Sequence, residues 1–547
     1  MTRILPLSLL FSAQTLLAQI TISGAITLRD GSKPTLAHVS IEPISAVRSS
    51  PPATAIFDGN YRLSVEKPGF YALLFSSPNC QPARIPVILT EKDKTVRLNV
   101  QMLGMMLKPE LSKVRIRVKG SKELAEMTRE ADGTFSFVAT ATADTFAYQI
   151  LDANARNRSH NGTQSDYFVY DGGGDYHSVL RVKQGESVKI VFDPKKMPRA
   201  PGDATAKLRW DKAHSYLEKF FVISERVETA RDEAIAALIE EREKNPGASE
   251  IKYDYKPIVS ELAAIKNNAS ERLEARQFAA LMRWSLLSFF NKADNAEAEE
   301  LLRLVPASSV IWAAYPNLLG LVGLGIDSAA SARAVQLLTE FKAKNPDRGV
   351  QCDALIGLGL YAMRSGDKEK LRAIYNELKE KYADLPDAEY GLKQFNPDRV
   401  IQAGNPVPDF EVTLFSGEKV SRASMLGKHY LIDFWAVWCV PCVEELPKMH
   451  EAYEKFKGKK GFEILSLSFD DSPQTVEKFR ATKFKMPWLH AHLAGAFNHE
   501  IAKRFEVIVV PKPILVDDKG YILAVDGDLR GENLEKTLSK HLGEASD

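Results

Sequence analysis

Two cysteines separated by two residues are the part of this sequence best suited to chemistry. They lie in the stretch Leu431–Pro447, which reads LIDFWAVWCVPCVEELP and places Cys439 and Cys442 directly after Trp438. Such a pair can bind a metal ion, form a structural disulfide, or exchange disulfides with another molecule. The number of cysteines, the loop between the two and the flanking elements distinguish these three kinds of chemistry.

A metal site is disfavoured because the chain has too few ligands. A structural zinc ion takes four ligands, typically from two close pairs, whereas Cys80 and Cys352 are isolated and fall in other predicted domains. We expect both to be buried and to act as small apolar residues, with little reason for a disulfide between them. His490 and His492 would share one face of a strand, but we expect them on a surface loop. We therefore predict neither a metal nor another cofactor.

A structural disulfide is the second alternative. A bridge between residues three apart closes a very short loop, so it removes little conformational entropy from the unfolded chain. Stability is therefore a poor reason for this pair, and redox chemistry is the favoured interpretation.

The elements around the pair place it where a thiolate is stabilised. Residues 431–437 are predicted as a short buried strand, and a helix is predicted from Pro441, because proline is tolerated in a first turn. Cys439 then lies at the helix N-terminus, where unpaired N–H groups and the dipole favour the nucleophilic thiolate. Cys442, one turn later, can attack a mixed disulfide formed at Cys439. A strand that enters a helix through CxxC is typical of a thioredoxin-like domain.

Longer motifs carry a family resemblance. The pattern W-C-x-P-C-x-x-E-x-P-x-L is present from Trp438, with Met449 in place of the usual Leu. FEILSLSFDDSPQTVEKFRATKFKMPWLHA resembles an extra β-α element, and FEVIVVPKPILVDDKGYILAVDG resembles a closing half. On these motifs, residues 405–542 resemble the exported thioredoxin-fold oxidoreductases of the TlpA/ResA-like group.

The resemblance implies an α/β thioredoxin fold and dithiol–disulfide exchange with protein thiols. It implies that Cys439–Cys442 is the redox-active disulfide, in which Cys439 attacks or is attacked and Cys442 resolves. Trp438 would contact substrate. Trp435 would flank the site as well, or belong to the core.

The closing half implies how a client protein is held. Pro511 takes the position of the family's cis-proline, and Val510 backbone groups would pair with an incoming client strand. The residues that the family usually has as Gly and Thr here are Val509 and Lys512. Lys512 would bring positive charge close to the dithiol, or be a solvated surface lysine.

Two carboxylates are candidates for proton transfer. Asp433 matches the buried acid of thioredoxin itself, and Glu445 matches the active-site acid of the exported group. Burial raises a carboxyl pKa, so our hypothesis is that Asp433 accepts the proton of Cys442 and Glu445 tunes it. The alternative for Glu445 is an exposed first-turn helix acid, favoured by the dipole.

The resemblance favours a reductant, for example one that keeps apocytochrome or other exported cysteines reduced. Such a role needs an electron donor, for which we expect a membrane thiol carrier. An oxidase or isomerase would use the same residues, because the direction depends on the reduction potential. A peroxidase is disfavoured by the second cysteine of the CxxC motif.

The N-terminus and the composition bound the remaining chain. Residues 1–19 read as a secretory signal with an apolar run too short to span a bilayer. We therefore expect export to the periplasm, with association with the cell envelope as an option. An uncleaved anchor is the alternative. No later stretch is long enough for a membrane span. A net charge of +1 argues against nucleic-acid binding.

The 547 residues predict a multidomain protein, at about 150 residues per domain. Residues 20–106 alternate apolar and polar positions and resemble the carboxypeptidase regulatory-like β-sandwich. Residues 107–200 are predicted as a second β-domain, 201–400 as a helical spacer, and 401–547 as the thioredoxin-like domain. One helical pair resembles a tetratricopeptide repeat, on Gly357, Tyr361, Gly366, Asp367, Tyr375 and Pro386. A partner- or surface-binding scaffold with an accessory redox domain is the alternative for the whole chain.

Overall fold

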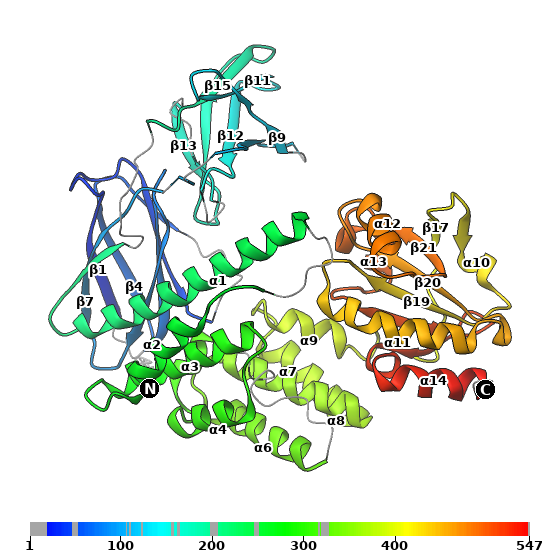
Figure 1. Ribbon diagram of the computed structural model, residues 1–547. Helices are drawn as coiled ribbons and strands as arrows, with labels where there is room; N and C mark the ends of the chain where they lie inside the picture. Colours follow the sequence, from blue (N-terminus) through cyan, green and yellow to red (C-terminus); the bar gives the residue numbers. More distant parts are fainter. Residues whose placement is uncertain are drawn as a thin grey trace, which may run out of the picture. The chain divides into compact units, whose positions relative to one another are not determined.

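The computed structural model describes residues 19–45, 53–105, 107–108, 111–121, 124–154, 158–160, 165–196, 206–244, 251–315, 318 and 328–544. The chain forms two compact units. One contains residues up to Glu233 together with Tyr255–Ala354, and the other contains Ala234–Asp254 together with the chain from Leu355 onward. This organisation, with its separate sheets and helical parts (Figure 1), fits the multidomain character predicted from the sequence.

Two sheets form the beginning of the first unit. Their strand orders are β16 (Lys207–Trp210), β7 (Thr95–Gln101), β1 (Ile20–Thr27), β4 (Asn60–Val65), and β3 (Thr54–Ile56), β2 (Ala37–Pro43), β5 (Gly69–Ser76), β6 (Ala83–Leu89). The apolar faces of the two sheets meet, because Tyr61 packs edge-on against Phe75 with ring centroids 5.1 Å apart. Since β16 pairs with β7, the first sheet gathers strands from both sides of residues 107–200.

Two further sheets enclose a separate apolar core. Their strand orders are β13 (Tyr167–Tyr170), β14 (Tyr176–Arg181), β12 (Thr145–Leu151), β8 (Arg115–Val118), β9 (Leu124–Glu126), and β10 (Thr128–Arg129), β11 (Phe135–Thr140), β15 (Ser187–Phe192). Ile150 of the first sheet and Ile190 of the second are fully buried in the same cluster. The likeness of residues 20–106 to the carboxypeptidase regulatory-like β-sandwich stays a prediction.

Helices follow the sheets. They are α1 (Glu218–Lys244), α2 (Lys256–Asn267), α3 (Leu273–Phe289), α4 (Asn295–Leu304), α6 (Ser328–Lys344), α7 (Arg348–Ser365), α8 (Lys368–Lys381) and α9 (Ala388–Gln394). Gly366 ends α7 with a φ of +73°, and Asp367 caps α8 by accepting a hydrogen bond from the Lys370 N–H. The tetratricopeptide likeness remains a prediction. In the parts of the chain described above, no helix is both long and apolar enough to cross a membrane.

The C-terminal part has the α/β arrangement that the resemblance implies. Its sheet has the order β21 (Leu489–His492), β20 (Glu463–Ser468), β19 (Tyr430–Trp435), β22 (Lys512–Val516), β23 (Ile522–Val525). The other elements are β17 (Glu411–Thr413), β18 (Lys419–Ser421), α10 (Arg422–Met425), α11 (Val440–Phe456), α12 (Pro473–Thr482), α13 (Glu500–Arg504) and α14 (Glu532–Leu542). Its short 3-10 turns are η3 (Lys459–Gly461), η4 (Ala496–Asn498) and η5 (Asp526–Leu529). Two further 3-10 turns lie earlier in the chain, η1 (Ser215–Leu217) and η2 (Val310–Ala314).

The central strand of this sheet positions the cysteines. Every residue of β19 is buried, as expected for a strand with neighbours on both edges and helices over both faces. It runs parallel to β20 and antiparallel to β22. The helices α11 and α14 lie side by side (Figure 1), and Lys455 of α11 pairs with Glu535 of α14 at 2.9 Å. The loop from β19 into α11 therefore carries the dithiol at the carboxyl end of the central strand.

Candidate active site

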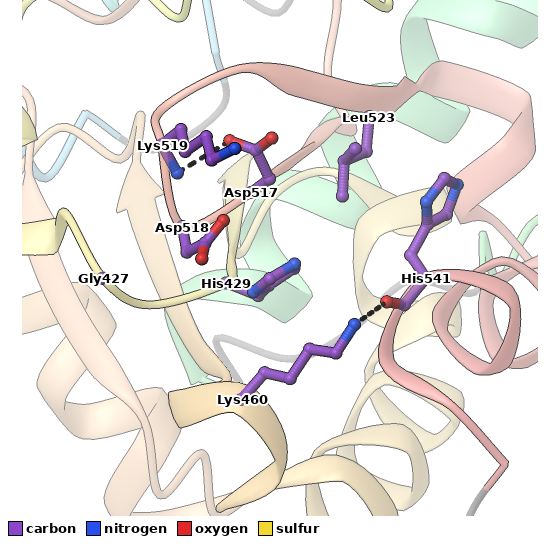
Figure 2. Close-up of a pocket in the computed structure, with 8 residues that line it drawn as sticks. All are labelled: Gly427, His429, Lys460, Asp517, Asp518, Lys519, Leu523 and His541. Atoms are coloured by element: carbon purple, nitrogen blue, oxygen red, sulfur yellow. Dashed lines mark hydrogen bonds between the residues drawn. The ribbon is translucent and has the colours of Figure 1, made fainter.

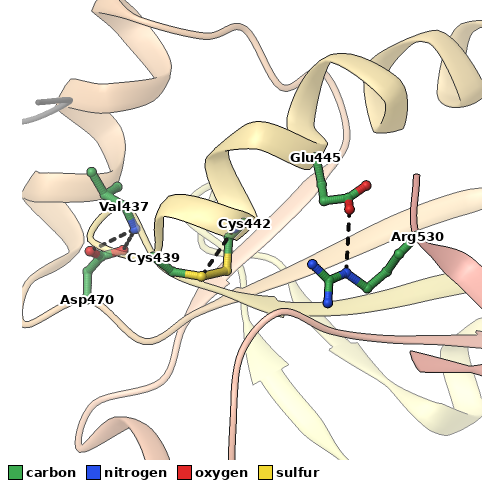
Figure 3. Close-up of a disulfide and its surroundings, with 6 residues drawn as sticks. All are labelled: Val437, Cys439, Cys442, Glu445, Asp470 and Arg530. Atoms are coloured by element: carbon green, nitrogen blue, oxygen red, sulfur yellow. Dashed lines mark hydrogen bonds and ion pairs between the residues drawn. A yellow bond between two sulfur atoms is a disulfide. The ribbon is translucent and has the colours of Figure 1, made fainter. Parts of the chain in front are cut away.

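Cys439 and Cys442 form a disulfide at the start of α11 (Figure 3). Cys439 is the N-cap residue, and its Sγ accepts a hydrogen bond from the Cys442 backbone N–H at 3.2 Å. Pro441 occupies the first turn, as the sequence predicts. Because N–H groups at a helix start stabilise negative charge, this position favours the thiolate of Cys439 once the disulfide is reduced.

Asp433 is a buried acid beneath the dithiol helix. It lies in β19 with only 2% of its surface exposed. Pro513 is its direct partner on β22, so the two side chains lie on the same face of the sheet. Burial, with a smaller effect of the Glu445 charge, raises the pKa of Asp433 to about 7 against the opposing effect of Arg530. A carboxyl group with this pKa can release or accept a proton at neutral pH.

Glu445 lies three residues after Cys442 and is held by the beginning of α14. Its Oε2 accepts a hydrogen bond from the Gly531 N–H at 2.8 Å, and its Oε1 lies 3.5 Å from the Nε of Arg530 (Figure 3). The alternative of an exposed first-turn acid is wrong, because the side chain lies beyond the first turn and is 20% exposed. The charge that acts on Asp433 is thus fixed in place by the contact between α11 and α14.

The loop before β22 contributes the remaining predicted residues. The peptide bond between Val510 and Pro511 is cis, which is the bond that the resemblance places in this form. Val510 is nearly buried, whereas Val509 is 47% exposed and Trp438, directly before Cys439, is 41% exposed. Two large apolar side chains on the loops next to the dithiol are therefore accessible to another protein.

The structure decides between the two interpretations of Trp435 and shows that Lys512 is buried. Trp435 is completely buried, so it belongs to the core of the sheet. Lys512 is not a solvated surface lysine, because its side chain is 3% exposed and its Nζ lies 3.0 Å from Asp526 Oδ1. Lys512 is opposite Phe434 in the sheet, and side chains alternate along a strand, so it is on the other face from Asp433.

Comparisons with known proteins concern this same part of the chain. A model of the AhpC/TSA family matches residues 403–525. The thiol-disulfide oxidoreductase ResA of Bacillus cereus is 33% identical over 148 residues, which are 27% of this chain and 82% of the relative. The chain belongs to the ResA-like thiol-disulfide oxidoreductases.

Two further proteins with similarity to this chain match about the same share of it. The thioredoxin-like protein YneN of Bacillus subtilis is 28% identical over 139 residues, which are 25% of this chain and 79% of the relative. The solved thioredoxin domain of a thiol-disulfide oxidoreductase from Bacteroides vulgatus is 30% identical, spans 26% of this chain and 98% of its own, and has a TM-score of 0.24. The ResA-like similarity therefore concerns about a quarter of the molecule.

A second buried acid, which the sequence reasoning missed, supports the active-site loop of this ResA-like oxidoreductase. Asp470 follows β20 and is 4% exposed. Both of its carboxylate oxygens accept a hydrogen bond from the Val437 N–H at 3.1 Å (Figure 3), and the Ser468 hydroxyl donates to it at 2.8 Å. Burial raises the pKa of Asp470. Because Val437 lies two residues before Cys439, this carboxylate fixes the loop that presents the dithiol.

Sequence signals for the missed residues were weak. Asp470 and Asp471 follow the apolar strand FEILSLSF as a pair, and only the fold shows that the first is buried and the second exposed. Arg530 lies far along the chain from Glu445, and nothing in the spacing of the two residues indicates their contact. Their side chains meet because α14 returns to lie along α11.

The histidines of this ResA-like domain are placed differently from the expectation. His490 and His492 lie on β21 rather than on a surface loop, because this segment pairs with β20 at the edge of the sheet. His490 is 4% exposed and stacks on Trp488 with ring centroids 5.9 Å apart. Among the residues that the structure describes, no group of three or more His, Cys, Asp or Glu side chains is arranged to hold a metal ion. Cys80 and Cys352 are buried thiols, as expected.

A polar hollow lies near the start of β19, at the opposite end of this strand from the dithiol, and Figure 2 shows the residues that line it. His429 precedes β19, whereas the cysteines follow it, and Lys460 of the hollow donates a hydrogen bond to the His541 carbonyl at 2.8 Å. Its lining residues are Gly427, His429, Lys460, Asp517, Asp518, Lys519, Leu523 and His541. None of the predicted site residues contributes to this hollow.

Proposed function

We propose that the chain is an exported reductase that transfers electrons from a thiol donor to disulfides of client proteins. The observation that carries this proposal is the Cys439–Cys442 pair at a helix N-terminus above a buried carboxyl group with a pKa of about 7. The name of the similar Bacillus cereus protein, a thiol-disulfide oxidoreductase, supports thiols and disulfides as the substrate class.

The reaction begins with the reduced dithiol. The Cys439 thiolate attacks one sulfur of a client disulfide, which breaks the client S–S bond, forms a mixed disulfide, and releases the first client sulfur as a thiolate. The Cys442 thiol then passes its proton to Asp433 and attacks the Cys439 sulfur. This step forms the Cys439–Cys442 disulfide and releases the second client thiolate, so the client gains two electrons.

The neighbouring groups have separate roles in this scheme. Asp433 accepts the proton because its pKa lies near neutral pH. Glu445, held by Arg530 and the Gly531 N–H, tunes that pKa through its charge. Trp438 and the backbone of Val510, next to Pro511, contact the client chain. A peroxidase stays disfavoured, because the site has a second cysteine within its CxxC motif.

The cell compartment and the electron donor complete the proposal. Residues 1–19, of which 1–18 lie outside the described residues, act as a secretory signal that directs the protein to the periplasm. A membrane thiol carrier reduces the Cys439–Cys442 disulfide after each turnover, since an exported reductase must receive its electrons across the membrane. The helical part, with its tetratricopeptide-like pair, serves as a spacer between the β regions and the redox domain.

The reduction potential of the Cys439–Cys442 couple tests the direction of electron transfer. We expect a potential at or below about −270 mV, the range of a reducing thioredoxin, measured by equilibration with dithiothreitol redox buffers. A value near about −120 mV, typical of a dedicated oxidant, contradicts the reductant role. Clients trapped on Cys442→Ser in periplasmic extracts would identify which exported thiols the protein serves.

A further inference from the structure

A short segment at the start of the region matched by the family model contacts the redox domain. Residues 399–405, here called the strap, join the helical part to the domain. The Gly404 N–H donates to the Ile522 carbonyl at 2.8 Å, and the Ile522 N–H donates to the Asn405 carbonyl at 2.9 Å. The Asn405 side chain donates to the Val400 carbonyl at 3.1 Å. The strap is thus fixed to the first residue of β23 and is held by a hydrogen bond within itself.

The strap contacts the loop that carries the cis-proline on its N-terminal side. Residues 506–511 are here called the proline loop. The carboxylate of Glu506 accepts hydrogen bonds from the Val400 N–H at 3.1 Å and from the Ile401 N–H at 3.2 Å. Glu506 has a φ of +51°, a conformation that residues other than glycine seldom adopt. Two hydrogen bonds from the strap therefore hold the first residue of the proline loop.

A second contact reaches the other side of the same loop. Arg399 Nη1 lies 3.8 Å from Asp526 Oδ2, and Asp526 Oδ1 lies 3.0 Å from Lys512 Nζ. Lys512 directly follows Pro511, and its side chain is almost fully buried. A buried ammonium group needs such a partner, because an uncompensated charge in the interior is costly. Arg399, at the start of the strap, therefore helps to hold the carboxylate on which Lys512 depends.

We propose that the strap, through Glu506 and Asp526, positions Val510 and Pro511 for pairing with a client chain. This inference rests on the proposed function, in which the backbone of Val510 pairs with the client. Glu506 and Asp526 are positioning residues, because they act on the client through the proline loop. Strand pairing requires the loop to hold one geometry, so loosening the loop weakens the binding of an extended chain. A small disulfide makes no such pairing and reacts independently of the loop.

The test compares two substrates in the full-length protein. In Glu506→Ala we expect the KM for a fluorescent peptide closed by one disulfide to rise about tenfold, while kcat changes little. The rate with hydroxyethyl disulfide stays at the parent value. Glu506→Gln keeps one acceptor oxygen, so we expect its KM to lie between those of the parent and Glu506→Ala. Glu418→Ala removes an exposed carboxylate of the same charge and is the matched control, with both rates unchanged.

Hydrogen exchange separates this inference from the proposed function. We expect backbone amides of the proline loop to exchange faster in Glu506→Ala than in the parent and in Glu418→Ala. A KM equal to the parent value, or an equal loss of rate with both substrates, overturns the positioning role. If the parent reduces neither substrate, the proposed function fails. Unchanged exchange in Glu506→Ala would then overturn the strap contact as well.

Discussion

Cys439→Ser abolishes disulfide exchange, with a loss of at least about a thousandfold, because the attacking sulfur is gone. Cys442→Ser has a different outcome. Its Cys439 still attacks a client disulfide, but nothing resolves the product, so each molecule stays linked to one client chain. The experiment mixes the reduced variants with a labelled peptide disulfide. Free peptide thiol is followed over time, and the covalent adduct is identified by non-reducing electrophoresis and mass spectrometry.

The matched control is Cys80→Ser, which removes a buried thiol far along the chain from the dithiol. We expect its exchange rate to equal that of the parent once the folded fraction is accounted for. Turnover by Cys439→Ser, or an adduct formed at Cys442 instead of Cys439, would show that the two cysteines have been given the wrong roles.

Asp433→Asn slows the resolving step about a hundredfold, because asparagine cannot take the proton from Cys442. The effect depends on pH in a defined direction. The pKa of Asp433 is about 7, so the parent gains its proton acceptor as the pH rises through neutrality. The variant lacks that gain. The measurement is the decay of a preformed Cys439 mixed disulfide at several pH values, and equal rates for parent and variant would remove Asp433 from the mechanism.

The same substitution is expected to stabilise the oxidised protein. The pKa of Asp433 rises from 3.8 to about 7 on folding, so between these values the folded chain holds a proton that the unfolded chain has lost. The parent therefore loses stability as the pH rises through this window. Asparagine avoids this loss, and its advantage grows to the order of a few kcal/mol above about pH 7. Urea unfolding of both oxidised proteins measures the difference, and an advantage that is the same at all pH values contradicts the assignment.

Local patterns in the sequence were sufficient for the dithiol and its two flanking elements. The apolar run from Leu431 and the proline in the first turn predict a strand followed by a helix, and the structure has β19 and α11 there. Asp433 stands out because it interrupts an otherwise apolar strand. These features depend on residues close together in the chain, and therefore a sequence reveals them.

Contacts between distant segments account for what the sequence did not reveal. Whether Lys512 is exposed depends on Asp526, which a turn of the chain brings back to it. Asp470 becomes an active-site residue because β20 ends beside the loop at Val437. Burial of a polar side chain depends on the partner that compensates it, and only the packed fold supplies that partner.

The ionisation of Cys439 in the reduced protein tests the central claim most directly. Ultraviolet absorbance of the thiolate is titrated in Cys442→Ser, with Cys439→Ser as the reference for the second sulfur. We predict a Cys439 pKa at least about one unit below the value of about 8.5 for a free cysteine, because the helix N-terminus stabilises the thiolate. A Cys439 pKa at or above about 8.5 would contradict an activated nucleophile at this position.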